Sequence, residues 1–95
     1  MRKKDLIRKI SEQSGIEQVA VRAVVELLFV NMRRDMVNGE HIFIRGFGSF
    51  ILMERKAKFG RDIGRGKPVF IPAHKKPFLK PCIEFLNEVK QHKEV

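Results

Sequence analysis

The residues with the clearest chemistry are the lysines and arginines between positions 55 and 80. This segment holds nine Lys or Arg side chains and one acid, so its net charge is nine minus one, or +8, of the formal +9 of the whole chain. The nine are Arg55, Lys56, Lys58, Arg61, Arg65, Lys67, Lys75, Lys76 and Lys80. Cations at this density neutralise phosphates, and each phosphate contact releases condensed counterions. The segment therefore predicts a polyanionic partner, nucleic acid first and an anionic membrane second.

The side chains that could support catalysis or hold a metal follow no functional spacing. His41, His74 and His92 are far apart and match no metal-ligand pattern. The single Cys82 cannot form an internal disulfide, and we expect it on the apolar face of the last helix, as buried filler and not as a nucleophile. No serine has a recognisable His–Asp arrangement, and there is no P-loop. We therefore expect no enzyme activity, no metal, no cofactor and no small-molecule substrate.

The bulk composition is that of one globular domain. The chain has 95 residues, of which 43% are hydrophobic and 33% charged, and its pI is near 10.2. Its densest apolar run, residues 19–32, is interrupted by polar side chains and falls short of the about 20 apolar residues of a membrane span. The first residues lead directly into an amphipathic pattern with no signal peptide. We expect a soluble, cytosolic protein without a membrane partner.

Two helices are expected in the first 39 residues. The first follows from the apolar spacing of residues 6–10 and ends at Gly15. The second runs from about Glu17 to Asn38 and is closed by Gly39. Its apolar residues fill the i, i+3, i+4, i+7 stripe and also positions off that stripe. A helix that is apolar over most of its circumference needs cover on several sides, which a second copy of the chain could supply.

From residue 41 the apolar period changes from 3.6 to 2. Residues 41–45 and 49–53 are predicted as two strands of a hairpin, with Gly46 and Gly48 at the bend around Phe47.

A second, basic hairpin is predicted to run out over about residues 54–59 and back over 67–71, with a glycine-rich tip at 60–66. A last helix is expected after Pro81, a residue type that suits a first helical turn.

The order of these parts resembles the bacterial HU/IHF histone-like family over essentially the whole chain. The resemblance depends most on Gly46-Phe47-Gly48-Ser49-Phe50, followed ten residues later by Gly60-Arg61. It implies an α+β fold: an intertwined dimer with a helical base, a three-stranded antiparallel sheet, a long basic β-ribbon arm per chain and a C-terminal helix. A single domain, 1–95, would then consist of a dimerisation base (1–39), a hairpin (40–53), a DNA-binding arm (54–72) and a closing segment with the last helix (73–95).

The resemblance also implies roles for individual residues. Family arms enter the DNA minor groove, where a proline at each tip wedges between base pairs after an arginine that matches Arg61. The wedge position is Ile63 here, and Asp62 replaces the usual asparagine; isoleucine is among the apolar wedges that minor-groove benders use. The expected DNA contacts are Lys3, Arg55, Lys56, Lys58, Arg61, Arg65, Lys67, Lys75, Lys76 and Lys80. The expected dimer core is Val25, Leu28, Phe29, Met32, Ile44, Phe47 and Phe50.

The sequence thus predicts an architectural, nucleoid-associated protein that binds duplex DNA through the minor groove with little sequence preference and bends and compacts it. The partner subunit would be a second copy or a related chain. Two alternatives stay open: a site-specific, IHF-like bender, and a scaffold module whose ribbon docks on an acidic protein. A helix-turn-helix regulator is disfavoured because the second helix is too apolar to read a major groove.

Overall fold

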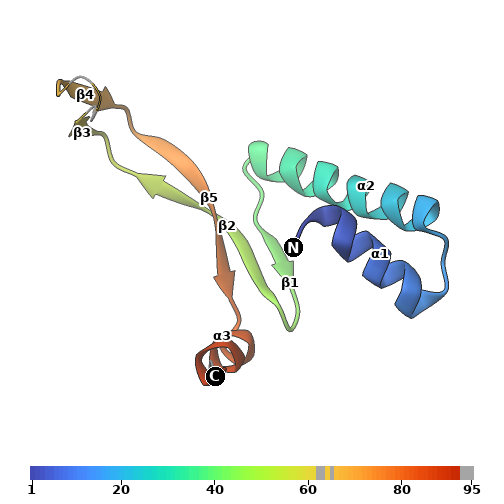
Figure 1. The fold of residues 1–95 in the computed structure, drawn as a ribbon. Helices are drawn as coiled ribbons and strands as arrows, with labels where there is room; N and C mark the ends of the chain where they lie inside the picture. The colour runs from blue at the N-terminus through green and yellow to red at the C-terminus, as the bar shows by residue number, and fades with distance from the viewer. Residues whose placement is uncertain (62–63, 65, 93–95) are drawn as a thin grey trace. The chain divides into compact units, whose positions relative to one another are not determined.

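The computed structural model describes residues 1–61, 64 and 66–92. It divides into two compact units, Met1–Val37 and Asn38–Val95, and each unit is described separately below. The first unit is helical, and the second contains the strands and the last helix (Figure 1). The predicted α+β class is confirmed, with three helices and antiparallel sheets in the described part of the chain.

The first unit is a pair of helices, α1 (Lys3–Ser14) and α2 (Gln18–Val37). The Asp5 carboxylate accepts a hydrogen bond from the backbone N–H of Arg2 at 2.9 Å, which satisfies a donor at the start of α1. Gly15 ends α1 with φ 75°, and its N–H donates to the Ser11 carbonyl at 2.9 Å. The predicted stop at Gly15 is therefore confirmed, and α2 lies within one residue of its predicted bounds at each end.

The contact between α1 and α2 buries little apolar surface. Ile7 and Val21 are 1% and 5% exposed, and they are the buried hydrophobic residues of the described part of the chain. The rest of α2 leaves large apolar side chains exposed, namely Val24, Leu27, Leu28, Phe29 and Val30. An exposed apolar surface of this extent on a single chain indicates an interaction face. None of the described helices is long and apolar enough to cross a membrane.

The second unit is built on a three-stranded antiparallel sheet in the order β1 (Ile42–Ile44), β2 (Gly48–Arg55) and β5 (His74–Pro81). Strand β2 is in the middle and pairs along its whole length with β5. Strand β5 lies in the segment that the sequence analysis treated as a closing segment. Its local sequence, HKKPFLKP, has no alternation of apolar and polar residues, so pairing with β2 defines it as a strand.

Beyond this sheet the chain forms a separate two-stranded ribbon of β3 (Lys58–Arg61) and β4 (Pro68–Ile71). The β2–β5 pairing ends at Arg55 and His74, and the β3–β4 pairing begins at Lys58 and Ile71. The predicted basic hairpin is therefore present, as two ladders separated by a short junction, residues 56–57 and 72–73.

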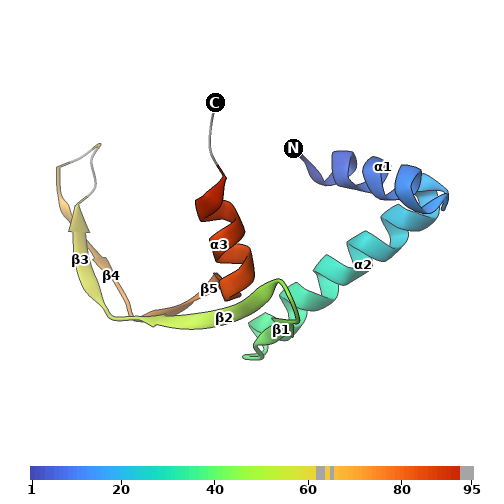
Figure 2. The same cartoon turned by 90° about the horizontal axis from the view of Figure 1, so that it is seen from below.

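The last helix begins later than the sequence predicts. Helix α3 spans Ile83–Gln91, and Pro81 belongs to β5 and not to a first helical turn, because it pairs with Gly48. Cys82 is the N-cap: its N–H donates to the Phe47 carbonyl at 2.9 Å and its Sγ accepts from the N–H of Phe85 at 3.5 Å. Cys82 therefore precedes the helix as its cap, and it is half-buried where the sequence predicted a buried residue within the helix. Figure 2 shows α3 rising from the end of β5.

Candidate nucleic-acid interface

The register of the central sheet decides which side chains share a face. Directly paired residues of an antiparallel sheet point to the same side. Three such pairs are Ser49 with Lys80, Met53 with Lys76, and Arg55 with His74. Arg55, Lys76 and Lys80 therefore share one face of the sheet, which we call the cationic face. The predicted contacts at these three positions form a row along β2 and β5.

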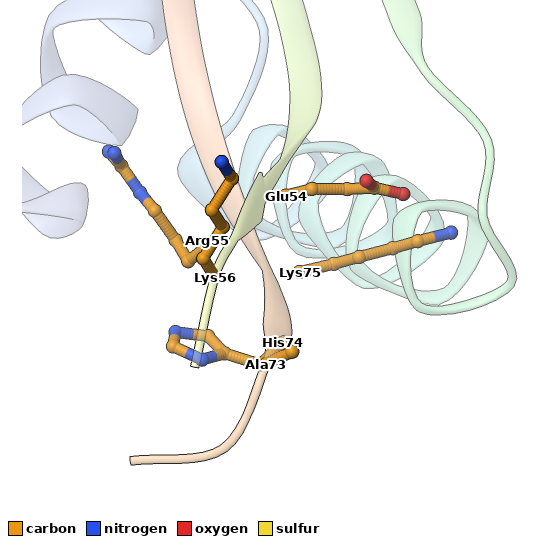
Figure 3. A pocket seen from close by; sticks show the side chains of 6 residues that line it. All are labelled: Glu54, Arg55, Lys56, Ala73, His74 and Lys75. Carbon is orange, nitrogen blue, oxygen red and sulfur yellow. The ribbon is translucent and has the colours of Figure 1, made fainter. Parts of the chain in front are cut away.

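Lys75 does not belong to this row. It pairs with Glu54, and both residues lie on the opposite face of the sheet. Figure 3 shows the Glu54 and Lys75 side chains extending together to one side of the strands, away from Arg55. Lys75 therefore cannot contact a DNA backbone that lies on the cationic face against Lys76 and Lys80.

The face that carries Glu54 and Lys75 is otherwise apolar. Ile42, Phe50 and Leu79 form one row across the three strands of this face. The ring of Phe50 lies 6.2 Å from that of Phe47, and the Phe47 ring lies 5.0 Å from that of Phe85 in α3, in stacked arrangements. Aromatic pairs in such geometry contribute about 0.5–1.5 kcal/mol beyond their buried area. The stack therefore joins α3 to the apolar face and supports the expected role of Phe47 and Phe50 as core aromatics.

The β3–β4 ribbon carries further predicted contacts. Lys58, Arg61 and Lys67 are exposed, and Arg61 pairs with Pro68 at the outer end of the ladder. Phe59 and Phe70 pair directly across the ribbon with ring centroids 5.3 Å apart, although Phe59 is 76% exposed. Ile63, the predicted wedge, and Arg65, a predicted contact, lie outside the described residues.

Two other predicted contacts occupy different settings. Lys3, in α1, has its Nζ 3.3 Å from a Glu26 carboxylate oxygen in α2, and both side chains are about half exposed. Exposed pairs of this kind contribute about 0–1 kcal/mol, so a phosphate can replace Glu26 at little cost. Lys56 lies in the junction between the two ladders and is exposed.

The expected dimer core is largely uncovered in the single chain. On α2, Val25 and Met32 are half-buried, whereas Leu28 and Phe29 are exposed by 52% and 48%. In the second unit, Ile44 and Phe47 are exposed by 38% and 39%, and Phe50 is half-buried. In each unit, these apolar side chains are left partly or largely exposed by the single chain, as a subunit interface would require.

His74 is a further polar residue of this region, which its sequence spacing tests only as a metal ligand. His74 is the first residue of β5, and its Nδ1 lies 2.9 Å from the Pro72 carbonyl oxygen. It lines a surface pocket of about 490 Å³ at the junction, together with four Lys or Arg side chains and Ala57. No group of three or more potential metal ligands occurs among the described residues, His74 included. The feature of the sequence that could have indicated a role for His74 in anion binding is its position inside the basic segment, residues 55–80.

The antiparallel sheet carries a row of cations and continues into a basic two-stranded ribbon. This arrangement is typical of proteins that bind nucleic acid through a β-ribbon. Comparison with known proteins gives the family. The family described as "Bacterial DNA-binding protein" matches residues 1–90. The chain therefore belongs to this family, which comprises the HU and IHF proteins.

Individual relatives support this assignment. The SPbeta prophage-derived DNA-binding protein HU 2 of Bacillus subtilis is 36% identical over 90 residues, which cover 95% of this chain and 98% of that protein. The beta subunit of integration host factor from Halorhodospira halophila is 39% identical over 90 residues, with 94% and 88% covered. Among solved structures, an Anabaena HU–DNA cocrystal structure matches with a TM-score of 0.87 and 26% identity, and covers 97% of this chain and all of that one.

Proposed function

We propose that this chain is an architectural, histone-like protein that binds duplex DNA with little sequence preference and bends it. The observation that carries the proposal is the register of β2 and β5, which places Arg55, Lys76 and Lys80 on one face. The basic ribbon continues from the same two strands, so sheet and ribbon together present cations along one length of backbone. Contacts of this kind supply affinity, whereas base contacts would supply sequence preference.

In the proposed complex the ribbon enters the minor groove and the cationic face supports the duplex. Bending 20–30 base pairs costs on the order of 1–6 kcal/mol, which the additional phosphate contacts of the bent duplex offset. The wedge assigned to Ile63 remains part of this proposal. The acidic-protein scaffold is not favoured, because the chain belongs to a DNA-binding family and resembles a protein solved with DNA. Relatives of the HU type and of the IHF type match at similar identity, so the comparisons do not choose between general and site-specific DNA binding. The proposal of little sequence preference therefore depends on the expected contacts to DNA phosphates.

We further propose that residues 1–95 act as one domain that a second copy, or a related subunit, completes. The support is the apolar surface of α2, where Leu28 and Phe29 are about half exposed and only Val21 of the helix is buried. An association that covers this surface would bring two ribbons to one duplex. We place the dimer in the cytoplasm, bound to the nucleoid. We propose no catalytic role, because the family to which the chain belongs is described by DNA binding.

The test is a set of salt titrations on a random duplex with the Lys80→Gln variant and, as the matched control, Lys75→Gln. Wild type should bind below micromolar concentration and weaken steeply with salt. The slope of log K against log salt is negative, and each lost phosphate contact makes it less steep by about 0.9. Lys80→Gln should therefore reduce the steepness by about 1.8 in a dimer, which carries two copies of the residue. Lys75→Gln should leave the slope near its wild-type value.

Equal slopes for the two variants would contradict the assignment of the cationic face. Absence of wild-type binding at low salt would overturn the function itself.

A further inference from the structure

His74 lies next to the junction between the two ladders, and the contact of its Nδ1 with a carbonyl oxygen fixes the tautomer of the neutral ring. A carbonyl oxygen only accepts hydrogen bonds, so Nδ1 of His74, at 2.9 Å from the Pro72 oxygen, carries the hydrogen. In the neutral ring Nε2 is then an acceptor. Protonation converts Nε2 into a second donor and adds a positive charge without disturbing the bond to Pro72.

The surroundings of the ring are cationic. The pocket of about 490 Å³ that His74 lines also contains Arg55, Lys56, Lys58 and Lys76. Of these, Arg55 pairs directly with His74 across the sheet, and Lys76 follows two residues later on the same face. A second pocket is lined by His74 with Arg55, Lys56, Ala73, Glu54 and Lys75, and the side chains of Glu54 and Lys75 extend away from the ring to the other side of the strands (Figure 3).

We propose that His74 is a proton-dependent ligand for a DNA backbone phosphate at the base of each arm. The inference rests on the proposed DNA binding and adds a residue and a pH dependence to it. The neutral ring turns the Nε2 lone pair toward the phosphate, which is repulsive. The protonated ring donates a charge-assisted hydrogen bond instead, one of the stronger kinds in proteins.

The sign follows from this difference. The complex favours the protonated ring, so DNA binding takes up a proton and the affinity rises as the pH falls. The measurement therefore spans about pH 5 to pH 8, the range in which histidine side chains in general change charge. Because the site is exposed to solvent and salt, we expect a gain on the order of tenfold for a dimer with two such sites.

The experiment measures the affinity for a random duplex of about 30 base pairs by fluorescence anisotropy at fixed ionic strength, at about pH 8 and about pH 5.5. Wild type should gain about tenfold at the lower pH. His74→Gln, which removes the repulsive lone pair, should bind at least as tightly as wild type at the higher pH and should lose the gain at the lower pH. His74→Lys, with a permanent charge, should bind tightly at both values. His41→Gln and His92→Gln are the matched controls and should keep the gain.

A second readout separates a phosphate ligand from a structural role. The nitrogen-15 signal of His74 Nε2 at about neutral pH should change from the unprotonated to the protonated type when DNA is added. The proposal is overturned if His74→Gln keeps the full gain, if the His41 or His92 control loses it equally, or if the Nε2 signal stays unprotonated in the complex at the lower pH. If wild type binds no DNA at either pH, the proposed function fails together with it.

Discussion

Substituting Gly48 by alanine tests the close approach between β2 and β5. Gly48 is the buried first residue of β2 and pairs with Ile44 on one side and Pro81 on the other. A Cβ built on it would lie 2.5 Å from the Lys80 carbonyl oxygen and 2.9 Å from the Pro81 Cα. Ordinary contacts begin at 3.4 Å, so 3.4 minus 2.5, or 0.9 Å, of additional space is needed. Both neighbours are backbone atoms, so the strand itself must move.

We expect Gly48→Ala to lower the free energy of unfolding by about 2–6 kcal/mol. Overpacking of this kind costs about 1–3 kcal/mol, and a strained backbone conformation, here φ 159°, adds about 1–3 kcal/mol. The same displacement moves Lys80, so the DNA affinity should fall as well. The assay is urea unfolding at one fixed protomer concentration, because the stability of a dimer depends on concentration.

Gly46→Ala is the matched control for Gly48→Ala. Gly46 has φ 77°, but a Cβ there would meet nothing within 4 Å. It should therefore cost only the left-handed conformation, about 1–2 kcal/mol. A loss below about 1 kcal/mol for Gly48→Ala, or a loss no larger than that of Gly46→Ala, would refute the argument from the close approach.

Two further substitutions test the subunit interface and the arm tip. Leu28→Glu places a charge on the exposed apolar surface of α2 and should shift the protein from dimer to monomer in analytical ultracentrifugation, because burying an unpaired carboxylate costs several kcal/mol. An unchanged sedimentation coefficient at micromolar concentration would place the interface elsewhere. Ile63→Ala removes the apolar side chain of the tip and should reduce the DNA bend angle, measured by fluorescence energy transfer, more than it reduces affinity. An unchanged angle would remove the wedge from the proposal.

The helices and the first hairpin were predictable because their signals are local. The stop at Gly15 and the bounds of α2 follow from apolar spacing and from glycines at the helix ends, which depend on the nearest few residues. The same holds for the hairpin of β1 and β2, whose apolar period is two. The charge of the arm needed only counting.

Strand β5 and the start of α3 were not predictable in the same way. The segment His74–Pro81 contains two prolines and four charged or titratable side chains, and it becomes a strand because β2 offers it a ladder of backbone partners. That ladder keeps Pro81 extended and moves the helix start to Ile83, which leaves Cys82 as the cap. A pairing between residues 19 to 33 positions apart, from Arg55 with His74 to Gly48 with Pro81, leaves no trace in local periodicity.

The amino-acid sequence alone determined the fold class, the basic arm and the need for a partner against α2, because charge and apolar periodicity are properties of the chain itself. Only the tertiary structure decided which of the basic side chains lie on each face of the central sheet. The register of β2 and β5 placed Arg55, Lys76 and Lys80 together and sent Lys75 to the other face beside Glu54. It also brought His74 opposite Arg55, with its Nδ1 held by the Pro72 carbonyl. The physical reason is that successive side chains of a strand alternate between faces, so their function depends on which strand is paired and in which register.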